Sequence, residues 1–504
     1  MSCGSHIHLY LLSVFLIACG PTAHLAQAEG QKPATSAGVV IVEHDKSVFR
    51  DDPDYDDQEY DATQQREIYG GKKAIDAPRP LLEIGNPMYR VGPLHEGNTA
   101  LGRKNPLAPS FLVYGEMRMA VAANDNGDVE TGLVATRLDL EFDAKLTSTE
   151  RFHAQIRPLD QAGKNTRYEF AGENRDLRFE RVTDLNLETF FFEGDLGNIY
   201  SGIADEYASF DLPVSVGLIP LLFQNGVWVD DKFIGGAFAI PARNSPALDI
   251  SNMDITFFGA IDKVTTPAIR DRAGNLADHG LSLYGANVFV EANSGYWEAG
   301  IGTLVGQGGF DELEYNSATL AFTRRYGGWL SNSIRGIWTF GQDRGPGGAQ
   351  QTADGMIFLL ENSFVTSLPS TLVPYMNLWI GFDRPQPLAD DTGILKNTGI
   401  TFETDNLTGF PKLDDTGHDT YGGAIGLQYL FNLDRQLVFE LSTVQVMGGI
   451  DVNGRAARDD QYGVGIRYQM NLDKAWLLRA DAMYGVLRST DDISGARLEL
   501  RRKF

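Results

Sequence analysis

Cysteine is almost absent from this chain, and the shortage limits its chemistry. The 504 residues include two cysteines, Cys3 and Cys19, and both lie close to the N-terminus. The chain beyond Cys19 can therefore form neither a disulfide nor a thiolate metal site.

Basic residues are also in short supply. Asp and Glu outnumber Lys and Arg by 67 to 43, which gives a formal net charge of −24. A protein that binds nucleic acid needs a basic face for the phosphates, so nucleic acid is excluded as a partner. Beyond the N-terminus there is also no stretch of about 20 uninterrupted apolar residues, which excludes a helical membrane protein.

The N-terminus contains one short apolar run, Leu9–Ala18, which fits the core of a signal peptide and is too short to span a membrane. Two processing routes stay open. Ala26-Gln27-Ala28 fits a cleavage site that would remove a signal peptide of residues 1–28. Leu16-Ile17-Ala18-Cys19 resembles the lipobox of bacterial lipoproteins, in which residues 1–18 are removed and Cys19 is lipidated. Both routes export the chain.

Residues 29–108 are polar, contain proline and lack periodicity. Within them the segment 51–61 (DDPDYDDQEYD) is dominated by acids, which repel one another and stay solvated. We expect this part to be an acidic, mostly irregular periplasmic extension.

From about residue 109 onward the sequence alternates between apolar and polar residues. In the segment 134–146 (VATRLDLEFDAKL), Leu138 and Leu140 fall on one face and Arg137 and Asp139 on the other. A strand has this period of two, whereas a helix would mix the two sets. After a short turn, residues 151–157 alternate in the same way, which predicts a hairpin with one apolar and one charged face.

Similar segments of about ten residues recur to the C-terminus and give 16 to 19 candidate strands, among them 111–121, 330–340, 421–431, 437–447, 462–470 and 476–486. Their length matches the roughly 9–11 residues needed to cross a bilayer at a tilt and exceeds the roughly 5–6 of soluble strands. An open sheet edge in lipid would leave backbone groups unsatisfied, so the sheet must close. Residues 109–504 are therefore predicted to form an all-β fold, a single transmembrane antiparallel β-barrel of about 16–18 strands.

The connections suggest how this barrel is oriented. Residues 432–435 and 471–474 form short turns, whereas 385–420 form a long acidic connection. Outer-membrane barrels have short periplasmic turns and long extracellular loops, so 385–420 is expected outside the cell, with a cysteine at Thr398 open to impermeant reagents. The terminal Phe504 resembles the signal that the outer-membrane assembly machinery recognises. That machinery and outer-membrane lipid are the expected partners.

As a pattern, residues 109–504 resemble the large porins and export channels of Gram-negative outer membranes. One stretch, Val214–Gly226 (VSVGLIPLLFQNG), has a glycine inside a strand followed by a turn that ends in glycine. It resembles a strand of alginate-export-like and porin barrels. The resemblance implies a channel for passage or export of small ions and polar solutes, or of an oligo- or polysaccharide.

The charged strand faces are the candidate selectivity residues. Opposed basic and acidic rows in a pore create a transverse field that sets ion selectivity. The candidates are Glu116, Arg118, Arg137, Asp139, Glu141, Asp143, Lys145, Arg151, His153, Arg157 and Arg335. The alternative is that these side chains pair with one another and fill the lumen. The barrel would then be a non-conducting anchor or sleeve for a secreted or surface-associated machine, with the acidic extension as its docking arm.

Enzyme motifs are missing from the chain. It contains no G-x-S-x-G, no H-E-x-x-H, no P-loop and no paired Cys–His cluster. His153 is the one histidine inside a predicted strand, where it is expected to line the lumen. We expect neither enzymatic activity nor a cofactor or metal ion.

Overall fold

The computed structural model describes residues 78–85, 97–100, 102–161, 163–172, 178–343, 351–396, 398, 406–431, 434–450 and 454–504. They all belong to one compact unit, Asp76–Phe504. The signal peptide, the lipidation site Cys19 and the acidic run 51–61 lie outside the described residues. These three features, and the boundary of the extension at residue 108, stay predictions.

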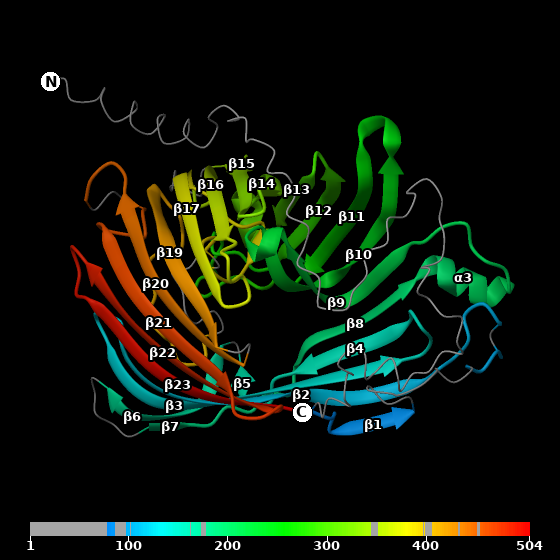
Figure 1. Cartoon of the computed structure of the whole chain (residues 1–504), viewed down its shortest axis with the longest axis horizontal. Coiled ribbons are helices and arrows are strands. Elements are labelled where there is room, and N and C mark those ends of the chain that lie inside the picture. Colours follow the sequence, from blue (N-terminus) through cyan, green and yellow to red (C-terminus); the bar gives the residue numbers. More distant parts are fainter. Residues whose placement is uncertain are drawn as a thin grey trace, which may run out of the picture. The chain divides into compact units, whose positions relative to one another are not determined.

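Eighteen strands in the described part of the chain form one closed antiparallel barrel, which confirms the predicted fold class. The first of them, β2, pairs with the last, β23, and this pairing closes the barrel (Figure 1). The eighteen strands are β2 (Ser110–Asp125), β3 (Glu130–Lys145), β4 (Arg151–Ile156), β8 (Leu187–Asp195), β9 (Pro213–Phe223), β10 (Val229–Ser245), β11 (Ile250–Asp262), β12 (Leu281–Ala292), β13 (Gly295–Gly306), β14 (Tyr315–Tyr326), β15 (Leu330–Phe340), β16 (Asp354–Phe364), β17 (Leu372–Arg384), β19 (Thr420–Phe431), β20 (Arg435–Val446), β21 (Gln461–Asn471), β22 (Trp476–Leu487) and β23 (Ile493–Lys503).

The remaining described elements are short. They are β1 (Leu82–Gly85), β5 (Asp160–Gln161), β6 (Lys164–Gly172), β7 (Arg178–Glu180), β18 (Ala389–Asp390), α3 (Leu196–Ala204), η1 (Gln224–Gly226), η2 (Pro246–Leu248) and η3 (Gly308–Leu313). In the part of the chain that the structure describes, no helix is both long and apolar enough to span a membrane.

The two ends of the barrel are distinguished by the chain termini. At the end where β2 begins, Gly115 N–H donates to the carbonyl oxygen of Phe504 at 2.8 Å, and Phe504 N–H donates back at 3.0 Å. Strand β1 pairs with Ser110–Val113 of β2, beyond the last residue of β23. We call this the terminal end, and the opposite end, where the 385–419 connection emerges, the loop end.

The predicted alternation of apolar and polar residues determines which face of each strand points outward. Met117 and Met119 of β2 are exposed, whereas Arg118 between them is buried. Mid-strand apolar residues elsewhere are also on the outside, with Ile301 exposed by 61 % and Ile425 by 60 %. A soluble protein rarely leaves such a continuous apolar surface in water, whereas a barrel in lipid requires one.

This orientation can be tested on β19. Ile425 lies in mid-strand on the outer face, and replacing it with arginine should cost about 2–4 kcal/mol of folding free energy. Gln428 on the same strand faces the lumen, and Gln428→Arg should change stability far less. Denaturant titration of the refolded barrel in vesicles measures both. Equal destabilisation by the two variants would show that the inside and outside of the barrel are assigned wrongly.

Candidate functional site

The charged residues predicted on β2 and β3 face the lumen, and those other than Lys145 form ion pairs within the described residues. Arg118 and Arg137 stand opposite one another in the register. Arg118 Nε lies 2.7 Å from Glu499 Oε1 of β23, and Arg137 Nε lies 3.2 Å from Asp139 Oδ2. Each of these two neighbouring guanidinium groups therefore has a carboxylate beside it.

Asp139 has a second partner from further along the chain. Arg157 donates through Nε to Asp139 Oδ1 at 2.8 Å, and its Nη1 lies 3.5 Å from Glu188. Lys232 of β10 also reaches Glu188 at 3.3 Å. The pairing therefore extends around the wall from β3 to β10.

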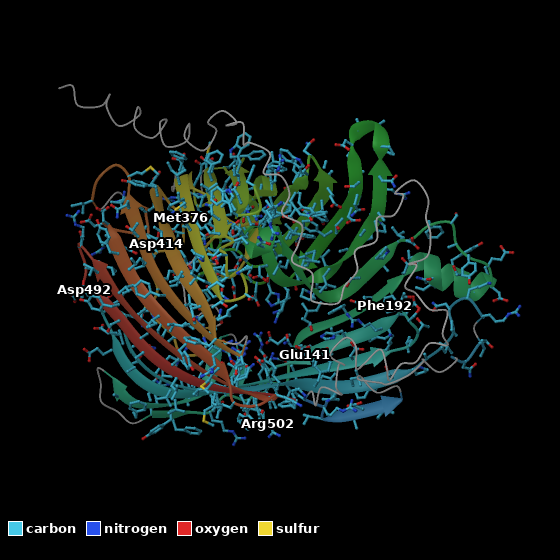
Figure 2. All side chains as sticks on the ribbon, in the orientation of Figure 1. Glu141, Phe192, Met376, Asp414, Asp492 and Arg502 are labelled. Atoms are coloured by element: carbon cyan, nitrogen blue, oxygen red, sulfur yellow. The ribbon has the colours of Figure 1, made fainter. Side chains whose placement is uncertain are left out.

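A second group lies on β3 and β4 nearer the terminal end. His153 Nε2 is 2.8 Å from Glu141, which Figure 2 labels. Arg151 bridges two strands, at 3.0 Å from Asp143 of β3 and 2.6 Å from Glu193 of β8. These pairs join β3, β4 and β8 on the lumen side.

Two further predicted residues, Lys145 and Arg335, behave differently from each other. Lys145 shares the face of this group but has no ion pair within the described residues. Arg335 of β15 is 1 % exposed; it donates to Gln224 and lies 3.4 Å from Glu361 and 4.0 Å from Glu298. The structure thus places Arg335 across the lumen from the others.

The densest charge cluster contains Arg467, which the charged-face pattern places on the lumen side, and three residues that the sequence does not single out. Asp481 of β22 accepts hydrogen bonds from Arg467 at 2.7 Å, Arg479 at 2.9 Å and Arg497 at 3.0 Å. The side chains of Asp481 and Arg497 are completely buried. The alternation of the 476–486 segment puts Arg479 and Asp481 on one face, so this signal could have identified them.

Glu499 links this cluster to β2. Arg501 Nη2 lies 3.1 Å from Glu499, and its Nη1 lies 3.6 Å from Glu116. Glu499 is also the partner of Arg118. We call the ion-paired lumen face of β21, β22, β23, β2, β3 and β4 the charged wall.

The long connection 385–419 turns into the barrel. Strand β18 within it pairs in parallel with Val229–Asp230 of β10. Leu388 N–H donates to Trp228 O at 2.8 Å, and Asp390 N–H donates to Thr265 O at 3.0 Å. We call the described residues of 385–419 the inward loop.

The inward loop then reaches the opposite side of the lumen. Asn124 of β2 donates through Nδ2 to Thr408 O at 2.7 Å. Leu407 packs with Leu133 in a small apolar cluster, and the Phe410 ring lies 5.4 Å from the Arg497 guanidinium carbon. The loop therefore contacts both β10 and the charged wall.

Glycines on the lumen face make room for the inward loop. A Cβ at Gly302 of β13 would lie 2.3 Å from Leu388 Cδ2, and one at Gly495 of β23 would lie 2.7 Å from Pro411 Cδ. Contacts this short are not tolerated between carbon atoms. The loop side chains thus occupy sockets that only glycine leaves open.

Most buried apolar residues gather inside the loop-end half of the barrel, where strand side chains meet the inward loop. Trp228 packs there and donates through Nε1 to Ser317 Oγ at 3.0 Å. Tyr315 donates through its hydroxyl to Pro387 O at 2.8 Å. This apolar core lies mainly over β10 to β17 and fills much of the lumen there.

This arrangement corrects one sequence-based expectation. Thr398 was expected to be accessible from outside, yet it is 1 % exposed. Its hydroxyl donates to Leu395 O at 2.6 Å, and its carbonyl oxygen accepts from Asn377 Nδ2 at 3.0 Å. The apolar side chains scattered through this acidic segment, such as Leu395 and Leu413, are buried on folding and draw the connection inward.

Burial also changes the titration of the inward loop. Burial and the neighbouring Asp415 carboxylate raise the pKa of Asp414 to about 6. Burial beside Arg384 lowers the pKa of His418 to about 4. Its Nε2 lies 3.2 Å from the Gln386 side-chain amide nitrogen, a donor that suits a neutral imidazole. Charging His418 would therefore disfavour the buried position of this segment.

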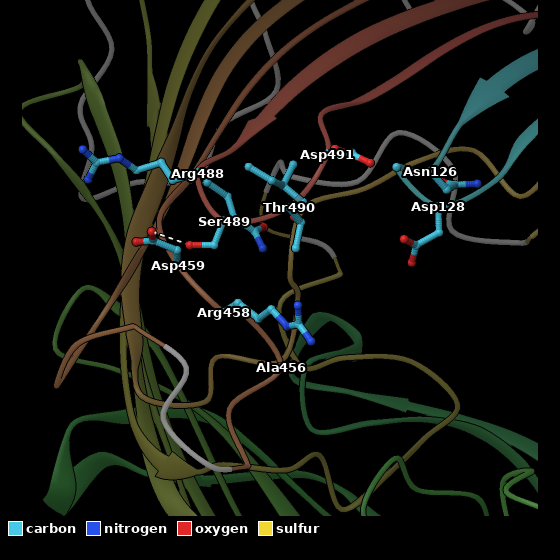
Figure 3. Close-up of a pocket in the computed structure, with 12 residues that line it drawn as sticks. Asn126, Asp128, Ala456, Arg458, Asp459, Arg488, Ser489, Thr490 and Asp491 are labelled. Carbon is cyan, nitrogen blue, oxygen red and sulfur yellow. Dashed lines mark hydrogen bonds between the residues drawn. The ribbon is translucent and has the colours of Figure 1, made fainter.

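A polar pocket of about 470 Å³ opens among three turns at the loop end (Figure 3). Asp128, Asp459, Asp491 and Arg488 are among the residues that line it, and Ser489 donates to Asp459 Oδ2 at 2.7 Å. No three His, Cys, Asp or Glu side chains within the described ranges are grouped to hold a metal ion.

No protein-family model matches the chain, and no curated protein matches its sequence. Solved structures do match. OccAB4 of Acinetobacter baumannii aligns over 78 % of this chain and 98 % of its own, with 11 % identity and a TM-score of 0.50. Two Pseudomonas aeruginosa structures are also similar, each with a TM-score of 0.49 and aligned over 78 % of this chain. OpdO is 11 % identical and covered over 97 % of its own chain. OpdK crystallised with vanillate is 12 % identical and covered over 98 % of its own chain.

At this level of identity the likeness to OccAB4 shows the fold. Together with the closed sheet and the apolar outer face, it makes the chain a multi-pass outer-membrane β-barrel in contact with lipid. The general resemblance to outer-membrane porins is confirmed.

The fit of loop and socket can be tested at Gly302. Overpacking a core costs about 1–3 kcal/mol, so Gly302→Phe should favour displacement of the inward loop by about tenfold. A cysteine at Thr398 should react slowly with a water-soluble maleimide in the parent barrel and about tenfold faster in the Gly302→Phe variant.

Gly336→Phe is the matched control. Gly336 lies on the outer face of β15, where an added Cβ would meet only Phe358 carbons at 3.4 Å. It should leave the labelling rate at Thr398 unchanged. Fast labelling already in the parent protein would contradict the buried position of the loop.

Proposed function

We propose that the protein is an outer-membrane channel for the passive passage of small ions and polar solutes, with its terminal end in the periplasm. One observation supports this most directly: the apolar core lies mainly over β10 to β17, whereas β21 to β4 present the charged wall. A solute that moves along the charged wall stays among groups that replace its hydration.

The charged wall suits selection among charged solutes. Three guanidinium groups surround one carboxylate at Asp481, and two guanidinium groups stand side by side at Arg118 and Arg137. Such fixed charges act more strongly beside the low-dielectric wall of a protein lumen than in bulk water. The predicted residues Glu116, Arg118, Arg137, Asp139, Glu141, Asp143, Lys145, Arg151, His153 and Arg157 are proposed as its selectivity residues, with Arg335 facing them.

A second candidate function is supported by the filling of the lumen. The inward loop closes much of the loop-end half, as a non-conducting anchor or sleeve would permit. A polysaccharide cargo is supported only by the resemblance of Val214–Gly226 to alginate-export-like barrels. Recognition of Phe504 by the assembly machinery and the absence of enzymatic activity likewise remain predictions.

Planar-bilayer recording tests the channel. Arg151 lies in the charged wall and is partly accessible, so Arg151→Gln should shift the reversal potential toward cation selectivity. The shift should shrink in high salt, because screening shortens the range of the field to about 3 Å at 1 M. Arg151→Lys, which retains the charge, should shift the potential much less.

Arg502→Gln is the control for charge outside the lumen. Arg502 lies on the outer face of β23 over the Trp476 ring, and its loss should leave the reversal potential unchanged. If neither the parent barrel nor the Gly302→Phe variant conducts ions, the channel proposal fails and the non-conducting anchor takes its place.

A further inference from the structure

Helix α3 exposes its apolar side chains and buries its small residues, which is the reverse of a helix on the surface of a soluble protein. Its apolar residues Leu196, Tyr200 and Ile203 recur at intervals of four and three and form one stripe. This stripe is exposed, with Ile203 at 81 % and Tyr200 at 50 %, whereas Gly197, Ser201 and Gly202 on the other side of the helix are buried. A helix packed on a soluble protein would bury the apolar stripe and expose the small polar one.

The inner stripe holds α3 firmly in this orientation. Gly202 lies so close to Gly102 that a Cβ on Gly102 would lie on the Gly202 carbonyl oxygen. Asp195 caps the helix by accepting from Asn198 N–H at 2.7 Å and also accepts from Leu212 N–H at 2.8 Å. These contacts therefore hold the apolar stripe on the outside of the protein.

The exposed stripe continues the lipid-facing surface of the barrel. Helix α3 follows β8 directly and lies beside the ends of β8 and β9 (Figure 1). On β4 and β8 the outward rings of Phe152 and Phe192 are 5.2 Å apart, and Figure 2 shows Phe192 near α3. Beyond the helix, Phe210 is also exposed and lies 6.4 Å from Tyr200. Outer-membrane barrels carry such aromatic girdles where lipid meets water.

Cationic residues lie beside the apolar stripe. Lys104 Nζ lies 4.1 Å from the centre of the Tyr207 ring, which is 79 % exposed. Arg103 donates to Asp205 at the C-terminal end of α3. Lysine and arginine at a membrane surface can keep their alkyl stems against apolar groups while their charges reach lipid phosphates.

We propose that α3 is an interfacial helix that lies on the bilayer at the terminal end, with Leu196, Tyr200 and Ile203 among the headgroups and the first methylenes of phospholipid. Lipid is the occupant because the stripe is continuous with the lipid-facing aromatic girdle, and Lys104 beside the Tyr207 ring supplies a cation for phosphate. The contact depends on the barrel fold and is independent of whether the barrel conducts.

Lipid contact can be measured with a probe at Ile203. A single cysteine replaces Ile203, is labelled with an environment-sensitive fluorophore, and the barrel is reconstituted into phosphatidylethanolamine–phosphatidylglycerol vesicles. The parent protein, labelled in parallel, gives the background from Cys3 and Cys19. The emission should shift to the blue, and doxyl lipid labelled near the headgroup should quench it several-fold more than lipid labelled deep in the acyl chain.

The matched control is a probe at Ser370, which is exposed in the turn between β16 and β17 at the same end. It should show neither the blue shift nor the quenching. A second arm places the probe at Tyr207 and compares Ile203→Asp with Ile203→Leu. The aspartate should reduce quenching several-fold, and the leucine should preserve it, with the folded barrel verified by its gel mobility.

Three outcomes would overturn the proposal. A probe at Ile203 that behaves like the one at Ser370 would place the stripe in water. In the Ile203→Cys variant, disulfide cross-linking of two barrels through the introduced cysteine at high yield would identify a second copy as the occupant. Blue-shifted emission without doxyl quenching in vesicles would mean that protein, and not lipid, covers α3.

Discussion

A strand edge left unpaired in hydrocarbon exposes backbone N–H and C=O groups that no solvent can satisfy, at several kcal/mol each. The pairing of β2 with β23 removes that edge, and the whole structure depends on it. It also brings Arg118 beside Glu499, two residues 381 positions apart. Beyond the last residue of β23, β1 pairs with the same edge of β2. Backbone hydrogen bonding along that edge of β2 therefore continues where β23 has ended.

A closed barrel also encloses an interior. The two sides of this interior are lined by different kinds of side chain. On one side it builds an apolar core with the inward loop, as a soluble domain would. On the other it lines the wall with ion pairs such as those of Asp481, which remain polar without leaving charges uncompensated. The two halves of the lumen therefore offer different environments to anything that enters.

The sequence predicts the wall well and the interior poorly. Period-two alternation places Arg137 and Arg335 toward the lumen and Leu140 away from it, because every strand in a barrel has the same two faces. It cannot say that Asp481 gathers Arg467 and Arg497, since those partners depend on the register between strands. The alternation also does not predict the inward loop. Leu388 and Phe410 belong to no periodic segment, and their contacts form only in the closed barrel.

The fit between the glycine sockets and the inward loop limits which substitutions and loop exchanges the barrel can accept. Gly302 and Gly495 on the wall are matched to Leu388 and Pro411 on the loop, although each pair is far apart in the chain. A loop transplanted from another barrel would meet walls shaped for different side chains, and a bulkier wall would reject the present loop. Wall and loop can therefore be exchanged only together, as one unit.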